Sequence, residues 1–256
     1  MKIEINKIYN MDCLEGMGYI EDKSIDMILC DLPYGTTACK WDIIIPFELL
    51  WNQYERIIKD NGAMIFTASQ PFTTLLISSN LKLFRYEWIW QKNYGSNFAV
   101  ARKQPFKEHE NICVFYKKQP TYKPIMEERS DSGKLFVRNC KYEKRNSEHT
   151  NSLKSGKANR DLEKRLPGSI KKFNMEVGLH PTQKPVTLFE YLIKTYTNEG
   201  DLVLDNCIGS GTTAIACIKT GRNFIGFDNG KDTKTGKYWA DIAIERIAKI
   251  KGDVAY

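Results

Sequence analysis

The stretch that decides the fold is Ser24-Ile25-Asp26-Met27-Ile28-Leu29-Cys30-Asp31-Leu32-Pro33-Tyr34-Gly35. Its first part, residues 25–29, is a short apolar run of the kind that forms a buried strand. An acid, a proline, an aromatic residue and a glycine then follow, and this composition predicts a loop that leaves the strand. At the carboxyl edge of an open α/β sheet, such loops commonly bind ligands.

The predicted loop has a definite chemistry. Pro33 fixes its own φ and favours an extended Leu32, while Gly35 lets the chain turn away. Asp31 and the Leu32 carbonyl offer two acceptors for one NH2 group, and Tyr34 offers a stacking surface. The loop therefore fits a planar ring that carries an amino group. The alternative is an ordinary strand exit in which Asp31 caps a turn, because Asp-x-Pro-Tyr alone is a weak signal.

Strands and helices alternate on both sides of this stretch. Apolar residues at helical spacing predict helices over about 12–20, 46–60, 71–78, 186–197, 212–219 and 238–250. Strands are predicted over 4–9, 63–67, 84–91, 111–116, 202–205 and 223–227, with a polar loop over 93–105 and with Asn61-Gly62 ending a helix. This alternation predicts an α/β domain with a mixed, mostly parallel sheet. On spacing alone, Asp12 is better explained as a helix cap than as a ligand of a polar group.

A second motif lies near the C-terminus. The strand that ends at Asp205 runs into Asn206-Cys207-Ile208-Gly209-Ser210-Gly211-Thr212-Thr213, then a helix, then a strand before Asp228. This is the order of a nucleotide-binding βαβ unit, in which glycines allow close approach and the second acid suits ribose hydroxyls. The glycine spacing also fits a nicotinamide enzyme. However, an acid directly before the loop suits the cationic end of a ligand better than a pyrophosphate.

Composition narrows the protein class. The 256 residues are 42% hydrophobic and 27% charged, which is ordinary for a globular protein. No run reaches the ~18 apolar residues of a membrane span and no signal peptide is evident, so we expect a cytoplasmic protein without membrane partners. The seven cysteines form no Cys-x-x-Cys pair and the three histidines lie far apart, so no metal site or disulfide framework is expected.

The net charge of +7 is unevenly distributed. Residues 117–174 contain 16 Lys and Arg against 7 Asp and Glu, which gives +9 and leaves −2 for the rest of the chain. Apolar residues are sparse in this segment, and aromatic side chains are interspersed. It is either a solvated insertion or a nucleic-acid surface, with cations for phosphates and with aromatic or amide groups for bases.

With Asp31-Leu32-Pro33-Tyr34 in its first half and Asp205 to Thr213 in its second, the chain resembles the amino-group DNA methyltransferases. These S-adenosylmethionine-dependent enzymes modify adenine N6 or cytosine N4. The motif order resembles the permuted beta group, and His180 to Pro185 and His109-Glu110 are similar to further segments of the family. The resemblance implies a Rossmann-like methyltransferase fold. Its parts would be 1–116 (catalytic), 117–179 (a basic target-recognition insertion) and 180–256 (cofactor-binding).

The resemblance also implies two groups of site residues. The catalytic group comprises Asp31, Leu32, Pro33 and Tyr34. Within it, Asp31 and the Leu32 carbonyl would bind the target amine, and Tyr34 would stack on the flipped base. The group expected to bind S-adenosyl-L-methionine comprises Asp12, Lys184, Asp205, Cys207, Gly209, Ser210, Gly211, Thr212 and Asp228. The family usually has proline at position 32 and phenylalanine at position 207. The first change keeps the carbonyl, whereas the second removes an aromatic support.

The expected function is therefore transfer of a methyl group to the N6 amine of a flipped adenine in double-stranded DNA. Asp31 favours adenine, because the family's cytosine-N4 enzymes more often have Ser there. Cytosine-N4 and RNA methyltransferases share the chemistry and are alternatives. A nicotinamide dehydrogenase would leave the Asp31 loop unexplained, and a non-catalytic DNA-binding module would need only the basic segment. A second copy of the chain and a cognate restriction endonuclease are further candidate partners.

Overall fold

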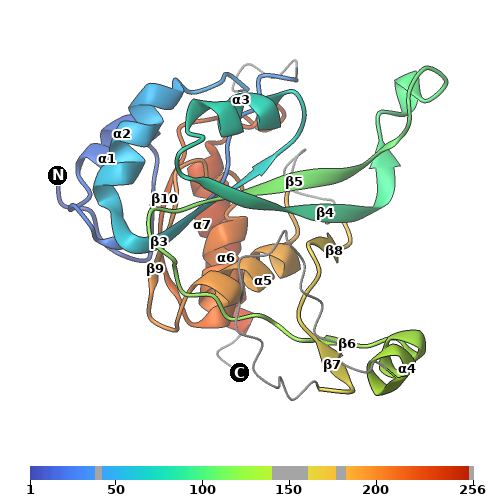
Figure 1. Ribbon diagram of the computed structural model, residues 1–256. Coiled ribbons are helices and arrows are strands. Elements are labelled where there is room, and N and C mark those ends of the chain that lie inside the picture. The colour runs from blue at the N-terminus through green and yellow to red at the C-terminus, as the bar shows by residue number, and fades with distance from the viewer. Residues whose placement is uncertain (38–41, 140–160, 177–182, 254–256) are drawn as a thin grey trace. The chain divides into compact units, whose positions relative to one another are not determined.

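The computed structural model describes residues 1–37, 42–139, 161–176 and 183–253 (Figure 1). Contacts divide the chain into two compact units, Met1–Lys123 with Ser169–Tyr256, and Pro124–Gly168. Residues 140–160 of the predicted basic insertion, and His180 to Thr182 of the segment His180 to Pro185, lie outside the described residues. No helix among the described residues is long and apolar enough to cross a membrane.

Eight strands of the described chain form one sheet in the first unit. Their spatial order is β1 (Lys7–Tyr9), β10 (Asn223–Phe227), β9 (Leu202–Asp205), β2 (Ile25–Asp31), β3 (Ile58–Ala68), β5 (Lys107–Phe115), β4 (Phe84–Ser96) and β8 (Ile170–Lys172). Only β5 runs antiparallel to its neighbours; the other pairings are parallel. The prediction of an α/β fold with a mixed, mostly parallel sheet is confirmed.

Helices cover both faces of this sheet (Figure 1). One hydrophobic cluster joins it to α5 (Val186–Tyr196), α6 (Thr212–Thr220) and α7 (Trp239–Asp253). A second cluster joins it to α1 (Cys13–Gly18), α2 (Phe47–Ile57) and α3 (Phe72–Ser79). Along β2, Met27 and Leu29 belong to the first cluster, and Ile28 and Cys30 to the second. A strand covered on both faces needs a continuous apolar run, and that is why this stretch lacks alternation.

The second unit is small. It contains a short antiparallel pair, β6 (Glu127–Glu128) and β7 (Lys164–Arg165), and the helix α4 (Asp131–Asn139). Arg165 forms an ion pair with Glu127 at 3.0 Å, and Lys134 contacts Glu163. Charged side chains rather than an apolar core therefore dominate the contacts among its described residues.

Two predicted boundaries are wrong. Helix α2 ends at Ile57, and Asn61-Gly62 lies within β3, where the pairing with β2 shifts register. The polar loop predicted over 93–105 is partly a strand extension, because β4 continues to Ser96 and a 3-10 turn, Phe98–Val100, follows. Asn97 adopts a left-handed conformation with φ 66° and its side chain accepts a hydrogen bond from the Lys107 amide, so polar side-chain bonds shape this hairpin.

Strand β8 belongs to the segment predicted as an insertion. Its residues pair in parallel with β4, from Ile89 opposite Ile170 to Gln91 opposite Lys172. The basic segment therefore contributes an edge strand to the main sheet.

Candidate active site

Polar side chains gather where the parallel strands end. In spatial order, Asp12 follows β1, Asp228 follows β10, Asp205 ends β9, Asp31 ends β2 and Thr67 lies near the end of β3. Neighbouring strands are about 4.8 Å apart, so these side chains form a row along one edge of the sheet. The chain proceeds from β2 to β3 in one direction and from β9 to β10 in the other. The boundary between Asp31 and Asp205 is thus a topological switch point, where α/β sheets bind ligands.

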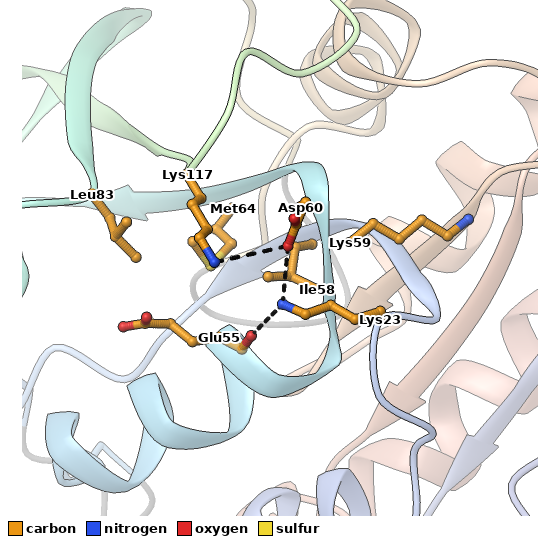
Figure 2. A pocket seen from close by; sticks show the side chains of 8 residues that line it. All are labelled: Lys23, Glu55, Ile58, Lys59, Asp60, Met64, Leu83 and Lys117. Carbon is orange, nitrogen blue, oxygen red and sulfur yellow. Dashed lines mark hydrogen bonds and ion pairs between the residues drawn. The ribbon is translucent and has the colours of Figure 1, made fainter.

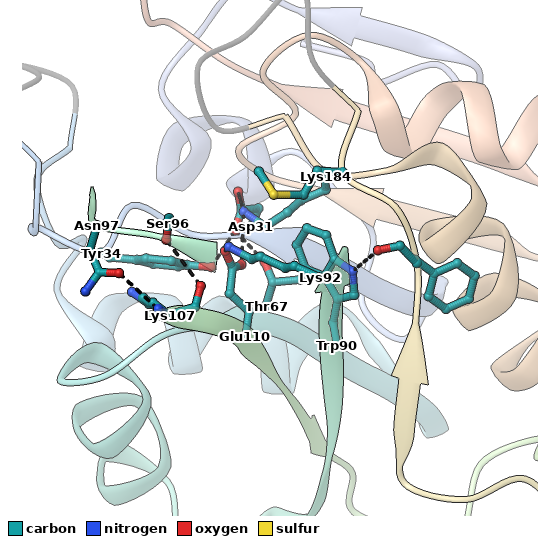
Figure 3. Close-up of polar contacts among 12 residues, drawn as sticks. Asp31, Tyr34, Thr67, Trp90, Lys92, Ser96, Asn97, Lys107, Glu110 and Lys184 are labelled. Carbon is teal, nitrogen blue, oxygen red and sulfur yellow. Dashed lines mark hydrogen bonds and ion pairs between the residues drawn. The ribbon is translucent and has the colours of Figure 1, made fainter. Parts of the chain in front are cut away.

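The Asp31 carboxylate is the centre of a network of hydrogen bonds (Figure 3). Its Oδ1 accepts a hydrogen bond of 2.7 Å from the Tyr34 hydroxyl and a second from the Thr67 hydroxyl. Its Oδ2 accepts one of 2.5 Å from the Lys184 ammonium. Thr67 lies directly opposite Asp31 in the β2–β3 register, so the sheet itself brings these two groups together.

Two buried lysines and Glu110 continue this network. Lys184 Nζ lies 3.5 Å from Glu110 Oε2, and Lys92 Nζ donates to Glu110 Oε1 at 2.6 Å. Although burial opposes the charge, Asp31 and Glu110 raise the pKa of the Lys184 ammonium above its ordinary value. The carboxylates of Asp31 and Glu110 thus balance the ammonium groups of Lys92 and Lys184 in a site that is largely removed from water.

Tyr34 has two kinds of contact. Its ring stacks on Phe72 with centroids 5.0 Å apart, and Lys184 Nζ lies 5.6 Å from the centre of the ring. Burial and the charge of Asp31 raise the pKa of its hydroxyl well above the ordinary value, so the hydroxyl stays a hydrogen-bond donor. The loop therefore presents an anchored aromatic ring beside the carboxylate.

Asp205 is the acid on the other side of the switch point. It is 3% exposed, and its carboxylate accepts hydrogen bonds from the Thr213 hydroxyl and, at 3.1 Å, from the Cys207 amide. Burial raises its pKa to about 7, and the charge of Asp31 adds to the effect. A cationic group would stabilise the ionised form here.

The glycine turn joins Asp205 to the next strand. The Gly209 amide donates to Asp228 at 2.9 Å, and Gly230 donates to the other oxygen of Asp228 at 2.8 Å. Gly211 has φ +84°, and a Cβ there would lie 3.0 Å from that of Ala243, so both the conformation and the approach of α7 require glycine. Burial raises the pKa of Asp228.

The remaining predicted cofactor residues lie around this turn or at its edge. Arg246 donates to the Ser210 carbonyl at 3.1 Å, and the Thr212 hydroxyl donates to the Lys184 carbonyl at 3.5 Å. Asp12 caps α1, because its side chain accepts from the Leu14 and Glu15 amides. The cap interpretation is thus confirmed, and the adenine contact stays a prediction.

Cys207, which stands where the family usually has phenylalanine, lies within hydrogen-bonding reach of two other thiols, Cys13 and Cys30. The sulfur atoms of these three cysteines therefore lie close together. No group of three or more His, Cys, Asp or Glu side chains in the described parts of the chain is arranged to hold a metal ion.

Sequence reasoning missed Thr67, Lys92 and the contact of Lys184 with Asp31. Thr67 had a usable signal, since it ends a predicted strand next to the one that ends at Asp31. Glu110 was noted only as part of a family pattern. Its proximity to the site follows from β5, which pairs antiparallel with β3 and brings Asn111 opposite Ala68.

A separate pocket lies at the opposite end of β3 (Figure 2). Lys23 donates to the Glu55 carbonyl at 2.8 Å and lies 3.5 Å from Asp60, which also meets Lys117 at 3.9 Å. The two contacts of Asp60 are surface ion pairs, which contribute little energy. Ile58, which lines this pocket, is the first residue of β3, whereas Thr67 lies near the last. The pocket is therefore separate from the site around Asp31.

Comparison with known proteins agrees with this arrangement. A family model described as DNA methylase matches residues 25–236. The chain belongs to this DNA methylase family. It is 42% identical to the type II methyltransferase M2.DpnII of Streptococcus pneumoniae, over 88% of this chain and 85% of that protein. It is 29% identical to the DNA adenine methyltransferase YhdJ of Escherichia coli K12, over 97% of this chain and 88% of that protein.

The solved structures agree on the fold. The crystal structure of an M1.HpyAVI–SAM complex matches with a TM-score of 0.60 at 23% identity, covering 94% of this chain and 98% of the other. Likeness at that identity shows the fold, which is that of the DNA methyltransferases. Family membership excludes the nicotinamide dehydrogenase alternative.

The residues of this DNA methylase fit S-adenosyl-L-methionine, the cofactor that the resemblance implies. Asp205 is a buried acid suited to an ammonium group, and Asp228 is an acid at the end of the next strand suited to hydroxyls. Gly211 caps the N-terminus of α6, where the amide groups of the first turn favour a carboxylate. The donor set thus matches the ammonium, carboxylate and ribose of that molecule.

Proposed function

We propose that this DNA methylase transfers a methyl group from S-adenosyl-L-methionine to the N6 amine of an adenine flipped out of double-stranded DNA. The observation that carries the proposal is the position of the Asp31 carboxylate, beside the Tyr34 ring and one strand away from Asp205. The reacting amine and the methyl donor would each have an acid at neighbouring strand ends.

The residues of the chain would make the amine reactive. Its lone pair is delocalised into the ring, and hydrogen bonds from its N–H groups to Asp31 and to the Leu32 carbonyl localise that pair on nitrogen. When bound, S-adenosyl-L-methionine supplies a methyl group already activated by the sulfonium. After transfer, Asp31 is placed to accept the extra proton on nitrogen. Holding the partners in line supplies the proximity effect.

Base flipping is part of the proposal, because a stacked base could not reach a carboxylate at a sheet edge. The Tyr34 ring would replace part of the lost stacking, worth ~1–3 kcal/mol per base. Phe72 supports the ring from behind, at a centroid distance of 5.0 Å. This support favours a fixed ring over a mobile one.

Adenine is favoured over cytosine by two observations. Asp31 is a charged acceptor, which forms stronger hydrogen bonds with an amine than a hydroxyl does. The relative YhdJ, 29% identical over 97% of this chain, is a DNA adenine methyltransferase by name. Cytosine-N4 methylation is the alternative that the same two acceptors permit, and methylation of RNA is a weaker one.

We further propose that residues 117–179 act as the target-recognition insertion, between a catalytic part over 1–116 and a cofactor-binding part over 180–256. The +9 charge of residues 117–174 supports contact with phosphates. A cognate restriction endonuclease agrees with the type II names of relatives such as M2.DpnII. A homodimer stays a prediction.

The test is expression in a host without DNA methylation, followed by sequencing that detects modified bases. We expect N6-methyladenine at one short recurring sequence, and none in cells that express Asp31→Ala. Modified cytosine at a recurring sequence would select the alternative. Unmodified DNA beside methylated RNA would favour an RNA substrate.

A further inference from the structure

Lys184 lies where the target amine is expected. Its ammonium is 2.5 Å from Asp31 Oδ2 and 5.6 Å from the centre of the Tyr34 ring. The other carboxylate oxygen already accepts two hydroxyl groups, from Tyr34 and Thr67. An entering amine that needs both Asp31 and the ring therefore meets the ammonium of Lys184.

Electrostatics also argue against this position during the reaction. The amine nitrogen becomes positive as it takes the methyl group, and a fixed cation beside it would raise the energy of that state. The side chain of Lys184 is only 6% exposed, so water screens its charge weakly. The ammonium is thus well placed before the base enters and badly placed afterwards.

Glu110 offers the ammonium a second position. Its Oε2 is buried, accepts no hydrogen bond, and lies 3.5 Å from Lys184 Nζ, while its Oε1 is held by Lys92 at 2.6 Å. Leaving a buried carboxylate oxygen without a donor is costly. A shift of about 0.7 Å would bring Nζ to the ~2.8 Å of a charge-assisted hydrogen bond with Oε2. Rotation of the flexible lysine stem about that bond would then carry the ammonium away from Asp31.

We propose that Lys184 holds the place of the target amine on Asp31, and that its ammonium transfers to Glu110 when the base enters. Glu110 is then a positioning residue: it draws the ammonium away and leaves Asp31 to the substrate. The inference rests on the proposed function, because it supposes that an amine-bearing base enters this site. It differs from the role expected for Lys184 from the family resemblance, which is to bind the cofactor.

The experiment uses the full-length chain and three variants: Glu110→Gln, Lys184→Met and the double variant. DNA carries 2-aminopurine directly beside the adenine that the wild-type enzyme methylates, so the fluorescence gained on unstacking reports that this adenine, with its own N6 amine, has left the duplex, independently of transfer. Single-turnover methyl transfer on unlabelled DNA, cofactor affinity and thermal unfolding are measured on the same samples. Glu108→Gln, an exposed residue of the same strand, is the matched control.

Glu110→Gln keeps the size of the side chain but removes its charge, so Lys184 stays on Asp31. We expect the fluorescence change and the transfer rate to fall about tenfold or more, with the cofactor dissociation constant within about twofold of wild type. In the double variant no ammonium has to move. Its fluorescence change should return to that of Lys184→Met alone, which makes the two substitutions strongly non-additive.

Other outcomes overturn the inference. Additive losses in the double variant would mean that no exchange occurs. Normal base entry in Glu110→Gln with a lowered unfolding temperature would mean a structural role only. A large loss of cofactor affinity in Lys184→Met, with Glu110→Gln unaffected, would assign the lysine to the cofactor. If the wild-type enzyme methylates no adenine, the proposed function itself fails, which is distinct from an active wild type without exchange.

Discussion

At the scale of single residues, the proposed methyl transfer depends on Asp31. Asp31→Ala removes the carboxylate that receives the target amine, and we expect the rate of methyl transfer to fall by about 10²-fold or more, as when an oxyanion-hole donor is lost. Cofactor affinity should stay near that of the wild type. Radiolabelled methyl transfer and equilibrium cofactor binding measure the two effects. Substantial activity in this variant would mean that the catalytic loop is assigned wrongly.

Asp228→Ala is the matched comparison, because it removes the acid from the other end of the proposed site. Cofactor affinity should weaken first, since Asp228 is proposed to meet the ribose. The variant also frees the Gly209 and Gly230 amides, so its unfolding temperature is measured beside its affinity. An unchanged dissociation constant would mean that Asp228 does not contact the ribose.

Asp205 predicts a pH dependence of stability. Its pKa rises from 3.8 in the unfolded chain to about 7 in the fold, because burial penalises the carboxylate. The contribution of a raised pKa is fully present below the unfolded value and is lost as the pH rises through the folded one. Relative to Asp205→Asn, the wild-type free energy of unfolding should therefore fall between pH 4 and about 7 and then level off. Urea titrations across this range test the effect, and parallel curves for the two proteins would contradict it.

At the scale of elements, Asp26 connects three strands. Its carboxylate accepts hydrogen bonds from Lys59 at 2.6 Å, in β3, and from the Leu202 amide at 2.9 Å, in β9. Asp26→Ala should cost about 1–3 kcal/mol of unfolding free energy, because it leaves a partly buried backbone donor unpaired. Lys59→Met breaks only a half-exposed ion pair, worth ~0–1 kcal/mol. Denaturant unfolding compares them, and equal costs would mean that the amide bond contributes nothing.

The elements also show what a sequence can and cannot reveal. Asp31, Asp205 and Asp228 were recognisable because each follows an apolar run that forms a parallel strand, and parallel strands bring their carboxyl ends to one edge. Glu110 lies on the antiparallel strand β5, and only the pairing of β5 with β3 and β4 brings it to this edge. A run of apolar residues does not specify its neighbours.

Lys184 illustrates a second limit. Its motif suggests a place near the cofactor, and its backbone lies beside α6, since its carbonyl accepts a hydrogen bond from the Thr212 hydroxyl. The long side chain nevertheless reaches Asp31 and Glu110, because two buried carboxylates attract one ammonium. Likewise, Asn61-Gly62 looks like a helix end in sequence, but pairing of Ile58 with Ile25 places it within a strand.

At the scale of the whole molecule, the charge is concentrated in one segment. Two adjacent lysines of β8 provide a matched test of whether this segment contacts phosphates. Lys171 is buried, with its ammonium 5.4 Å from the Trp88 ring and 5.2 Å from the Tyr191 ring, whereas Lys172 is exposed. We expect Lys172→Ala to reduce the salt slope of DNA binding by about one unit, and Lys171→Ala to lower stability instead. Equal slopes for Lys172→Ala and wild type would place the phosphate contacts elsewhere.

The central claim is that the chain methylates adenine N6 through Asp31, and nucleoside mass spectrometry tests it most directly. DNA from a methylation-deficient host is incubated with S-adenosyl-L-methionine labelled in its methyl group and with either the wild type or Asp31→Ala, then digested to nucleosides. We predict labelled N6-methyladenine from the wild type and almost none from the variant. Labelled N4-methylcytosine without N6-methyladenine, or equal labelling by both proteins, would contradict it.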